Sequence, residues 1–180
     1  WNIEQVIHSL KLKPEQQALL RKELFHHQDW SEMDHGKVDE ANVVSRVCSR
    51  SILKKSQVEE ALLTAKNSLL PIADTLLLMQ DIFKHDIKMY CLSNMSRETY
   101  SHIKNDELFN MFSGIVISGI EECMKPSDDI FHLAISRFKV EPKEVLFIDD
   151  SLVNINAAQR LGIGTFHFKR SQSCYADIRQ

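Results

Sequence analysis

The stretch VLFIDDSLVNINAAQRLG, residues 145–162, decides the fold. Its first four residues form an apolar run typical of a buried strand, and two adjacent acids, Asp149 and Asp150, follow directly. Three apolar residues then recur at helical spacing: Val153, Ala157 and Leu161. The stretch therefore predicts a strand, an acidic turn and a helix in immediate succession.

The same alternation continues on both sides of this stretch. Short apolar runs at residues 88–92, 115–118 and 165–168 are typical of strands, and segments with helical spacing separate them. Repeated β-α-β units predict a mainly parallel sheet with helices on both faces. We therefore expect residues 67–180 to form an α/β core of the Rossmann-like type.

Residues 1–66 have a different pattern, because their apolar residues keep helical spacing throughout. Pro14 suits the first turn of a helix, and Gly36 is expected to mark a break between helices. Ser56 and Glu59 match the S-x-x-E capping box at a helix start. This part of the chain is therefore expected to be an all-α subdomain.

Composition excludes several kinds of partner. The 180 residues carry 22 basic and 25 acidic side chains, for a net charge of -3. This balance gives no reason to expect nucleic acid or an anionic membrane as partner. The four cysteines form no CxxC pair, which fits a reducing, cytoplasmic setting. We find no pattern typical of a signal peptide or a membrane span.

Polar residues follow three of the expected strands at the point where each strand ends. They are Ser93 and Asn94 at one strand end, Lys125 near the next, and Asp149 with Asp150 at the third. Taken singly, each group would also suit helix capping or solvated surface. Because ligands of parallel sheets bind beyond the carboxyl ends of the strands, we expect the three groups to lie at one edge.

The chemistry of this set favours a phosphate and a metal ion. Two carboxylates about 4 Å apart repel by roughly 4 kcal/mol at an effective dielectric constant near 20, so the acid pair favours a nearby cation. Mg²⁺ binds through one or two carboxylates plus a substrate phosphate. The set thus predicts phosphoryl transfer, with the metal at Asp149 and Asp150 and the phosphate at Ser93, Asn94 and Lys125.

Three motifs resemble those of the haloacid dehalogenase (HAD) superfamily of hydrolases, over about residues 70–170. LSN at 92–94 resembles the second motif of that superfamily, and Lys125 in MKPSDDIF resembles the third. FIDDSLVNINAAQRLG, which begins at Phe147, resembles the fourth. The shared order and spacing make the resemblance specific.

The resemblance implies a role for each motif residue. Asp149 and Asp150 match the acids of the metal site, and Ser151 and Asn154 belong to the loop that supports them. Lys125 is expected to steady both the phosphate and the nucleophile. Mg²⁺ is the implied cofactor, and the implied substrate is a small phosphorylated metabolite such as a sugar phosphate.

The DxD motif that carries the superfamily's Asp nucleophile is absent from the 180 residues. In the superfamily it ends the first strand, which lies between the strand that carries Asp149 and the strand that carries Ser93. We therefore expect this strand upstream of Trp1, and we expect the 180 residues alone to be inactive. In the complete enzyme the nucleophile would form an aspartyl-phosphate that water hydrolyses.

Residues 1–66 would then be the small α-helical cap of the first subclass. They resemble the branch that includes a bacterial sugar-phosphate phosphatase and the N-terminal phosphatase domain of soluble epoxide hydrolase. A cap of this kind closes over the site and contacts the substrate. Trp30 and Arg97 are therefore candidates for substrate specificity.

Other functions remain compatible with this fold, and the sequence leaves the oligomeric state open. A noncatalytic member would bind a partner, and loss of the upstream nucleophile would favour that function. A haloacid dehalogenase shares the Asp nucleophile but needs no metal, so the acid pair argues against it. A phosphoacceptor receiver domain has the acids before the lysine, whereas here Lys125 precedes Asp149.

Overall fold

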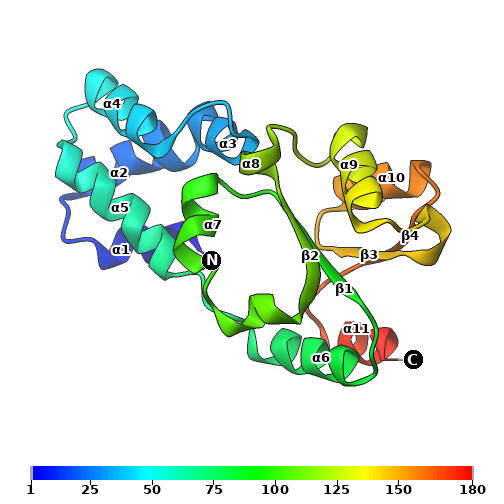
Figure 1. Ribbon diagram of the computed structural model, residues 1–180. Coiled ribbons are helices and arrows are strands. Elements are labelled where there is room, and N and C mark those ends of the chain that lie inside the picture. The colour runs from blue at the N-terminus through cyan, green and yellow to red at the C-terminus, as the bar shows by residue number, and fades with distance from the viewer. Residues whose placement is uncertain (1, 180) are drawn as a thin grey trace.

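Residues 3–67 form helices only, as their periodicity predicted. Figure 1 shows the computed structural model, which describes residues 2–179. The helices are α1 (Ile3–Ser9), α2 (Pro14–Leu20), the π-helix η1 (Arg21–Phe25), α3 (Gln28–His35), α4 (Glu40–Arg50) and α5 (Lys55–Asn67). Their apolar faces enclose one hydrophobic cluster, which includes the fully buried Leu20, Leu24, Val43 and Val47. We call this part of the chain the helical region.

Local signals explain where several of these helices begin and end. Pro14 is the first residue of α2, and Gly36, at φ +82°, ends α3 in the left-handed conformation. The expected capping box with Ser56 as the N-cap is wrong, because the N-cap of α5 is Lys54, two residues earlier. There the Gln57 side chain accepts a hydrogen bond of 2.9 Å from the backbone N–H of Lys54.

The rest of the chain alternates between helix and strand, which confirms the α/β fold class. Its elements are α6 (Ala73–Lys84), β1 (Met89–Ser93), α7 (Arg97–Ile103), η2 (Glu107–Met111), β2 (Phe112–Ile117), α8 (Ser118–Glu121), α9 (Asp128–Phe138), η3 (Pro142–Glu144), β3 (Leu146–Asp149), α10 (Leu152–Arg160), β4 (Gly164–His167) and α11 (Gln172–Ile178). We call this part the α/β region. Ser118, expected as the last residue of a strand, is instead the first residue of α8.

The four strands of the described residues form two parallel pairs instead of one continuous sheet. β1 pairs with β2, with Ser93 opposite Ile117, and β3 pairs with β4, with Asp149 opposite His167. Within residues 2–179, the facing edges of β1 and β3 have no strand partner. Their backbone N–H and C=O groups are therefore open to pairing on that side.

A cavity of about 710 Å³, which we call the slot, lies between the two strand pairs. Leu92 and Phe147 line it from the two pairs, Leu78 lines it from α6, and Phe131 and Ala134 line it from α9. Most of the other lining residues are apolar as well. The slot is therefore a sheet interior that the described residues leave unfilled.

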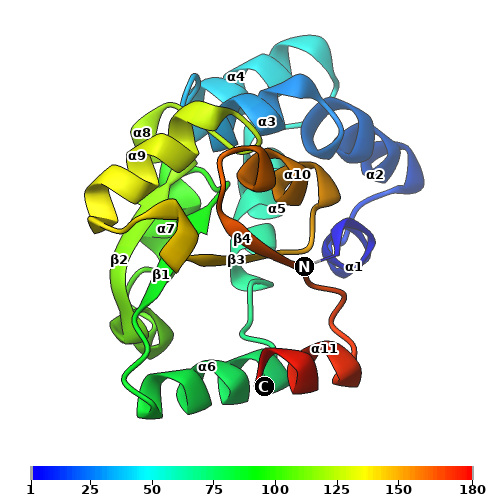
Figure 2. The same ribbon diagram turned by 90° about the vertical axis from the view of Figure 1, so that its right-hand side faces the viewer.

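Helices cover the strands on both sides. α9 and α10 pack against β2 and β3 around a second hydrophobic cluster, which includes the buried Val116, Ile130, Phe131, Ala157 and Ala158. On the other side α6 and α11 lie side by side (Figure 2), joined by a hydrogen bond of 2.9 Å between Thr75 Oγ1 and the Tyr175 hydroxyl. No helix in residues 2–179 is both long and apolar enough to cross a membrane.

Candidate functional site

Lys125 links the two strand pairs at their carboxyl ends. Its Nζ donates to the backbone oxygen of Leu92 in β1 (2.8 Å) and to Oδ2 of Asp149 in β3 (2.7 Å). Lys125 is only 8% exposed, and its Nζ lies 5.4 Å from the centre of the Phe147 ring. A buried cation therefore holds the end of β1 close to the end of β3.

Asp149 is fixed on both of its carboxylate oxygens. While Oδ2 accepts from Lys125, Oδ1 accepts from the backbone N–H of Ser151 (2.8 Å) and from Nδ2 of Asn154 (3.0 Å). Ser151 and Asn154 are the two residues expected to support the acids, and both contact Asp149. The carboxylate is thereby held in one orientation at the strand end.

Asp150 has quite different surroundings. Its side chain is 61% exposed, and its Oδ2 lies 3.1 Å from Nη2 of Arg170. Asp149 and Asp150 therefore each have a basic partner, Lys125 in one case and Arg170 in the other. The acid pair alone does not require a metal ion, contrary to the argument from charge repulsion.

Asn94 positions the backbone of Lys125. Its Nδ2 donates to the Lys125 carbonyl oxygen, and its Oδ1 accepts from the Lys125 N–H, both at 2.9 Å. Ser93, the last residue of β1, lies between Asn94 and the carbonyl of Leu92 that Lys125 contacts. Ser93, Lys125 and Asp149 thus converge at one edge, as the strand-end rule predicted.

The acid pair is of the chemical kind that Mg²⁺ takes, but its two carboxylates do not converge on one point, because Asp149 is hydrogen-bonded on both oxygens and Asp150 contacts Arg170. Asp149 and Asp150 offer carboxylate oxygens, and Mg²⁺ typically takes one or two carboxylates together with waters and a substrate phosphate. Within residues 2–179, no group of three His, Cys, Asp or Glu side chains is placed to hold a metal ion. Any Mg²⁺ at this edge therefore needs further oxygen ligands.

Cys91 lies in β1 close to these residues, but its chemistry is suppressed. Burial raises the pKa of its thiol to about 11, and the charge of Lys125 only partly opposes this shift. The thiol is therefore protonated at neutral pH and is a poor nucleophile.

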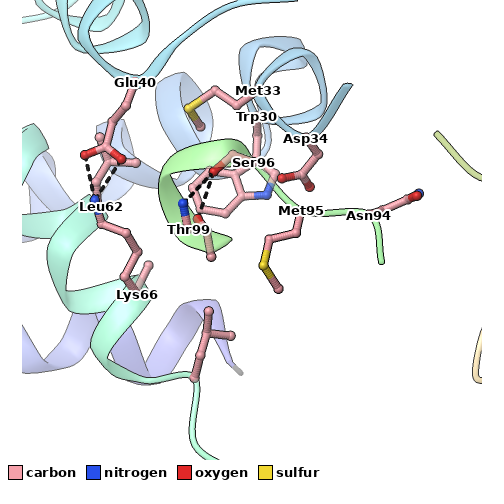
Figure 3. A pocket seen from close by; sticks show the side chains of 12 residues that line it. Trp30, Met33, Asp34, Glu40, Leu62, Lys66, Asn94, Met95, Ser96 and Thr99 are labelled. Carbon is pink, nitrogen blue, oxygen red and sulfur yellow. Dashed lines mark hydrogen bonds and ion pairs between the residues drawn. The ribbon is translucent and has the colours of Figure 1, made fainter. Parts of the chain in front are cut away.

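The sequence did not reveal a pocket of about 180 Å³ between the helical region and the loop after β1 (Figure 3). Of the two specificity candidates, Trp30 lines this pocket, and Arg97 does not. The Arg97 Nη2 instead donates to the backbone oxygen of Gly36 (2.9 Å) and lies 3.8 Å from Glu122. Arg97 therefore joins the two regions.

Ser118 is a second residue that the sequence did not single out. It is fully buried, its hydroxyl donates to the backbone oxygen of Asp34, and it accepts from the Met95 N–H (2.9 Å). The hydroxyl thus connects α3, α8 and the loop after β1. Because Ser118 directly follows β2, the strand-end rule that selected Ser93 could have selected it too.

Comparison with known proteins identifies the family. The sequence profile of haloacid dehalogenase-like hydrolases matches residues 6–162 of the chain. The chain belongs to this family. In this HAD-like hydrolase, Lys125 and Asp149 are in direct contact at the ends of the strands.

Characterised relatives of this HAD-like hydrolase are distant. The sesquiterpene phosphatase astK of Aspergillus oryzae is 22% identical over 152 residues, which cover 84% of this chain and 78% of that protein. The mouse acyl-CoA dehydrogenase family member 10 is 30% identical over 82 residues, and the drimenol cyclase drtB of Aspergillus calidoustus is 22% identical over 153. The matches cover 43% and 82% of this chain, but only 8% and 29% of those two proteins.

Solved structures share the fold over nearly the whole chain. A predicted HAD-like family hydrolase from Porphyromonas gingivalis has a TM-score of 0.76 at 21% identity, with 99% of this chain and 91% of that chain covered. The HAD family enzyme bt-2542 from Bacteroides thetaiotaomicron, in complex with magnesium and inorganic phosphate, has a TM-score of 0.72 at 20% identity over 94% and 86%. The L-2-haloacid dehalogenase from Xanthobacter autotrophicus has a TM-score of 0.67 at 17% identity over 98% and 76%.

Proposed function

We propose that the complete protein is a Mg²⁺-dependent phosphomonoester hydrolase. Its Asp nucleophile would lie on a strand in the slot between β1 and β3. The observation that carries this proposal is the position of Lys125. Its ammonium bridges the ends of β1 and β3, so it would lie beside the carboxyl end of any strand placed between them.

The slot has the properties that an inner strand of a parallel sheet requires. Its lining is mostly apolar, and both neighbouring strand edges lack a partner within the described residues. A strand buried on both faces would complete the hydrogen bonding of those edges and fill the cavity. An apolar run that ends in Asp-x-Asp would meet both demands and would place a carboxylate near Lys125.

The residues already in place suit attack on phosphorus. The nucleophile would form an Asp–phosphorus bond as the ester P–O bond breaks, and water would then hydrolyse the acyl phosphate to release phosphate. The Ser93 hydroxyl and the Lys125 ammonium would bind phosphoryl oxygens, and Asn94 would keep Lys125 in place. A Mg²⁺ ion held by Asp149 and Asp150 would neutralise charge on the phosphoryl group.

The helical region would act as the cap, with residues 1–66 as the cap and residues 67–180 as the core. Two contacts join them next to the site, Ser118 to the Asp34 carbonyl and Arg97 to the Gly36 carbonyl. A cap in this position would exclude water from the phosphoryl group.

The named relatives support the same reaction class. AstK is described as a sesquiterpene phosphatase, and the bt-2542 enzyme was crystallised with magnesium and inorganic phosphate. The substrate would accordingly be a small phosphorylated metabolite.

The test is a phosphatase assay on the protein encoded by the complete gene. We expect phosphate release from an aryl phosphate in Mg²⁺, loss of release in EDTA, and a loss of about 100-fold or more in kcat for Lys125→Met. Lys143→Met, an exposed lysine of η3, is the matched control and should leave the rate unchanged. Absence of phosphate release from a folded, Mg²⁺-binding protein would contradict the proposal. Chloride release from a 2-chloro acid in EDTA would indicate a dehalogenase instead.

A further inference from the structure

The pocket of about 180 Å³ adjoins the site where phosphate is proposed to bind. One of its walls is the loop Asn94–Met95–Ser96, which directly follows Ser93. The opposite wall belongs to α3 and α5 of the helical region. A phosphomonoester bound at Ser93 and Lys125 would therefore have this pocket within reach of its alcohol portion.

The lining of the pocket is largely apolar. The larger apolar side chains that line it are Trp30, Met33, Leu62 and Met95, which Figure 3 labels, together with Leu69. The Asn94 side chain points away from the others, consistent with its two hydrogen bonds to Lys125. Most of the contacts that the pocket offers are therefore to carbon and sulfur atoms.

The charged groups at the pocket are unsuited to an ionic substrate group. Lys66 is the only Lys or Arg among the described lining residues, and both carboxylate oxygens of Glu40 lie 2.8 Å from its Nζ. Asp34 is half-buried, and its carboxyl accepts a hydrogen bond from the Ser96 N–H. Burial raises the pKa of Asp34 to about 6, so the pocket already disfavours one negative charge.

The volume limits the size of the group that fits. An engineered apolar cavity of about 150 Å³ binds benzene, so a pocket of about 180 Å³ holds little more than one aromatic ring. A larger alcohol would have to extend out of the pocket or widen it.

We infer that this pocket binds the leaving group of the substrate, and that this group is an uncharged, apolar alcohol moiety of benzyl or branched five-carbon size. The inference rests on the proposed phosphatase function. It differs from the sugar phosphate suggested by family resemblance. A sugar brings several hydroxyls that would lose water against a surface that is mostly apolar. A carboxylate-bearing alcohol would meet Asp34 and Glu40 and would find Lys66 already paired.

The first experiment measures binding and needs no turnover. Benzyl alcohol is titrated onto the protein from the complete gene and followed by saturation-transfer NMR, with glycerol as the polar comparison. We expect millimolar binding of benzyl alcohol and no transfer to glycerol. Equal transfer to both alcohols, or transfer to neither, would overturn the inference.

Paired variants locate that binding in the pocket. Leu69→Glu places a carboxylate in the lining and should weaken benzyl alcohol binding roughly tenfold or more. Leu70→Glu changes the neighbouring residue, which is 77% exposed and outside the lining, and should leave binding unchanged. Circular dichroism of both variants checks the fold. Equal effects of the two substitutions would place the binding elsewhere and overturn the inference.

The second experiment compares kcat/KM for benzyl phosphate, glycerol phosphate and phosphoglycolate. We expect benzyl phosphate to exceed the other two by roughly tenfold or more. Glu40→Gln frees the ammonium of Lys66 and should raise kcat/KM for phosphoglycolate specifically. If phosphoglycolate or glycerol phosphate is the best substrate, the inference about the pocket is overturned, but the proposed phosphatase function is not. Hydrolysis of none of the three, with benzyl alcohol still bound, would count against the phosphatase function and preserve the pocket's ligand class.

Discussion

Lys125 at the strand ends and Asp34 in the pocket beside α3 are ionisable side chains whose surroundings act on them in opposite ways. Lys125 has a carboxylate and a carbonyl oxygen within 2.8 Å, so its charge is compensated where it is buried. The carboxyl of Asp34 accepts a hydrogen bond from the backbone N–H of Ser96, which lowers its pKa. The effect of burial is larger and raises the pKa to about 6. The structure thus compensates a cation at the strand ends and disfavours an anion in the pocket beside α3.

We predict that Asp34→Asn stabilises the protein at neutral pH and has little effect at low pH. Because the folded-state pKa is raised, the wild type loses stability as pH rises from about 4 to about 6 and stays at the lower value above that. The variant lacks this loss, so it should gain up to about 3 kcal/mol near pH 7.5 and almost nothing near pH 4. Urea unfolding at the two pH values measures the difference. Asp86→Asn, at an exposed position, is the control, and an equal gain at both pH values would contradict the prediction.

At the scale of elements, helices α3 and α4 are joined by an ion cluster inside the helical region. Asp29 in α3 is only 1% exposed, and its carboxylate lies 2.8 Å from Nη1 of Arg46 and 2.7 Å from Nη2 of Arg50. Burial raises the pKa of Asp29, but the hydrogen bonds from the two arginines outweigh burial and leave the pKa below its ordinary value. The charged form of Asp29 therefore stabilises the packing of the two helices.

We predict that Asp29→Ala lowers the free energy of unfolding by about 3 to 5 kcal/mol near pH 7, because it leaves two arginines without their buried partner. Since the folded-state pKa is lowered, this stabilisation is complete above about pH 4 and is lost as pH falls further. Chemical denaturation of the wild type and the variant measures it. Glu32→Ala removes a more exposed partner of Arg46 and should cost no more than about 1 kcal/mol. If both variants lose a similar amount of unfolding free energy, the burial of Asp29 does not strengthen its ion pairs and the prediction is contradicted.

At the scale of the whole molecule, residues 2–179 contain two separate hydrophobic clusters. One fills the helical region, and the other lies between β2, β3, α9 and α10. The helical cluster borders a pocket of only about 180 Å³, whereas the α/β region has the slot of about 710 Å³ between its strand pairs. Unfilled volume of this kind lowers stability because the lining atoms lose packing contacts.

We predict that the 180-residue chain unfolds in two steps, with the α/β region first. Trp30 reports the helical region once Trp1→Phe has removed the other indole, and far-UV circular dichroism reports both regions. The dichroism change should begin at a lower urea concentration than the Trp30 fluorescence change. Val116→Ala should shift only the first step, and Val43→Ala only the second, since each is fully buried in one cluster. Coincident transitions for the two probes would show one cooperative unit instead.

Particular residues show how far sequence reasoning reaches. One rule predicted that Ser93, Lys125 and Asp149 lie close together: the carboxyl ends of parallel strands lie at one edge of the sheet. Asp150 was grouped with Asp149 on the same grounds, yet adjacent residues at a strand end point in different directions, and Asp150 contacts Arg170. The contacts of Ser118 could not be read from the sequence, because its partners Asp34 and Met95 are 84 and 23 residues away in the chain.

The alternation of the four strands with α6, α7, α9 and α10, the helical character of residues 3–67 and the edge that carries the polar residues were all readable from the sequence. Those features depend on local periodicity and on strand direction, which a linear pattern records. The separation into two strand pairs, the pairing of Glu40 with Lys66 and the apolar pocket beside Asn94 were decided only by the tertiary structure. They depend on side chains that meet across long stretches of chain, and no local pattern specifies which of those side chains will meet.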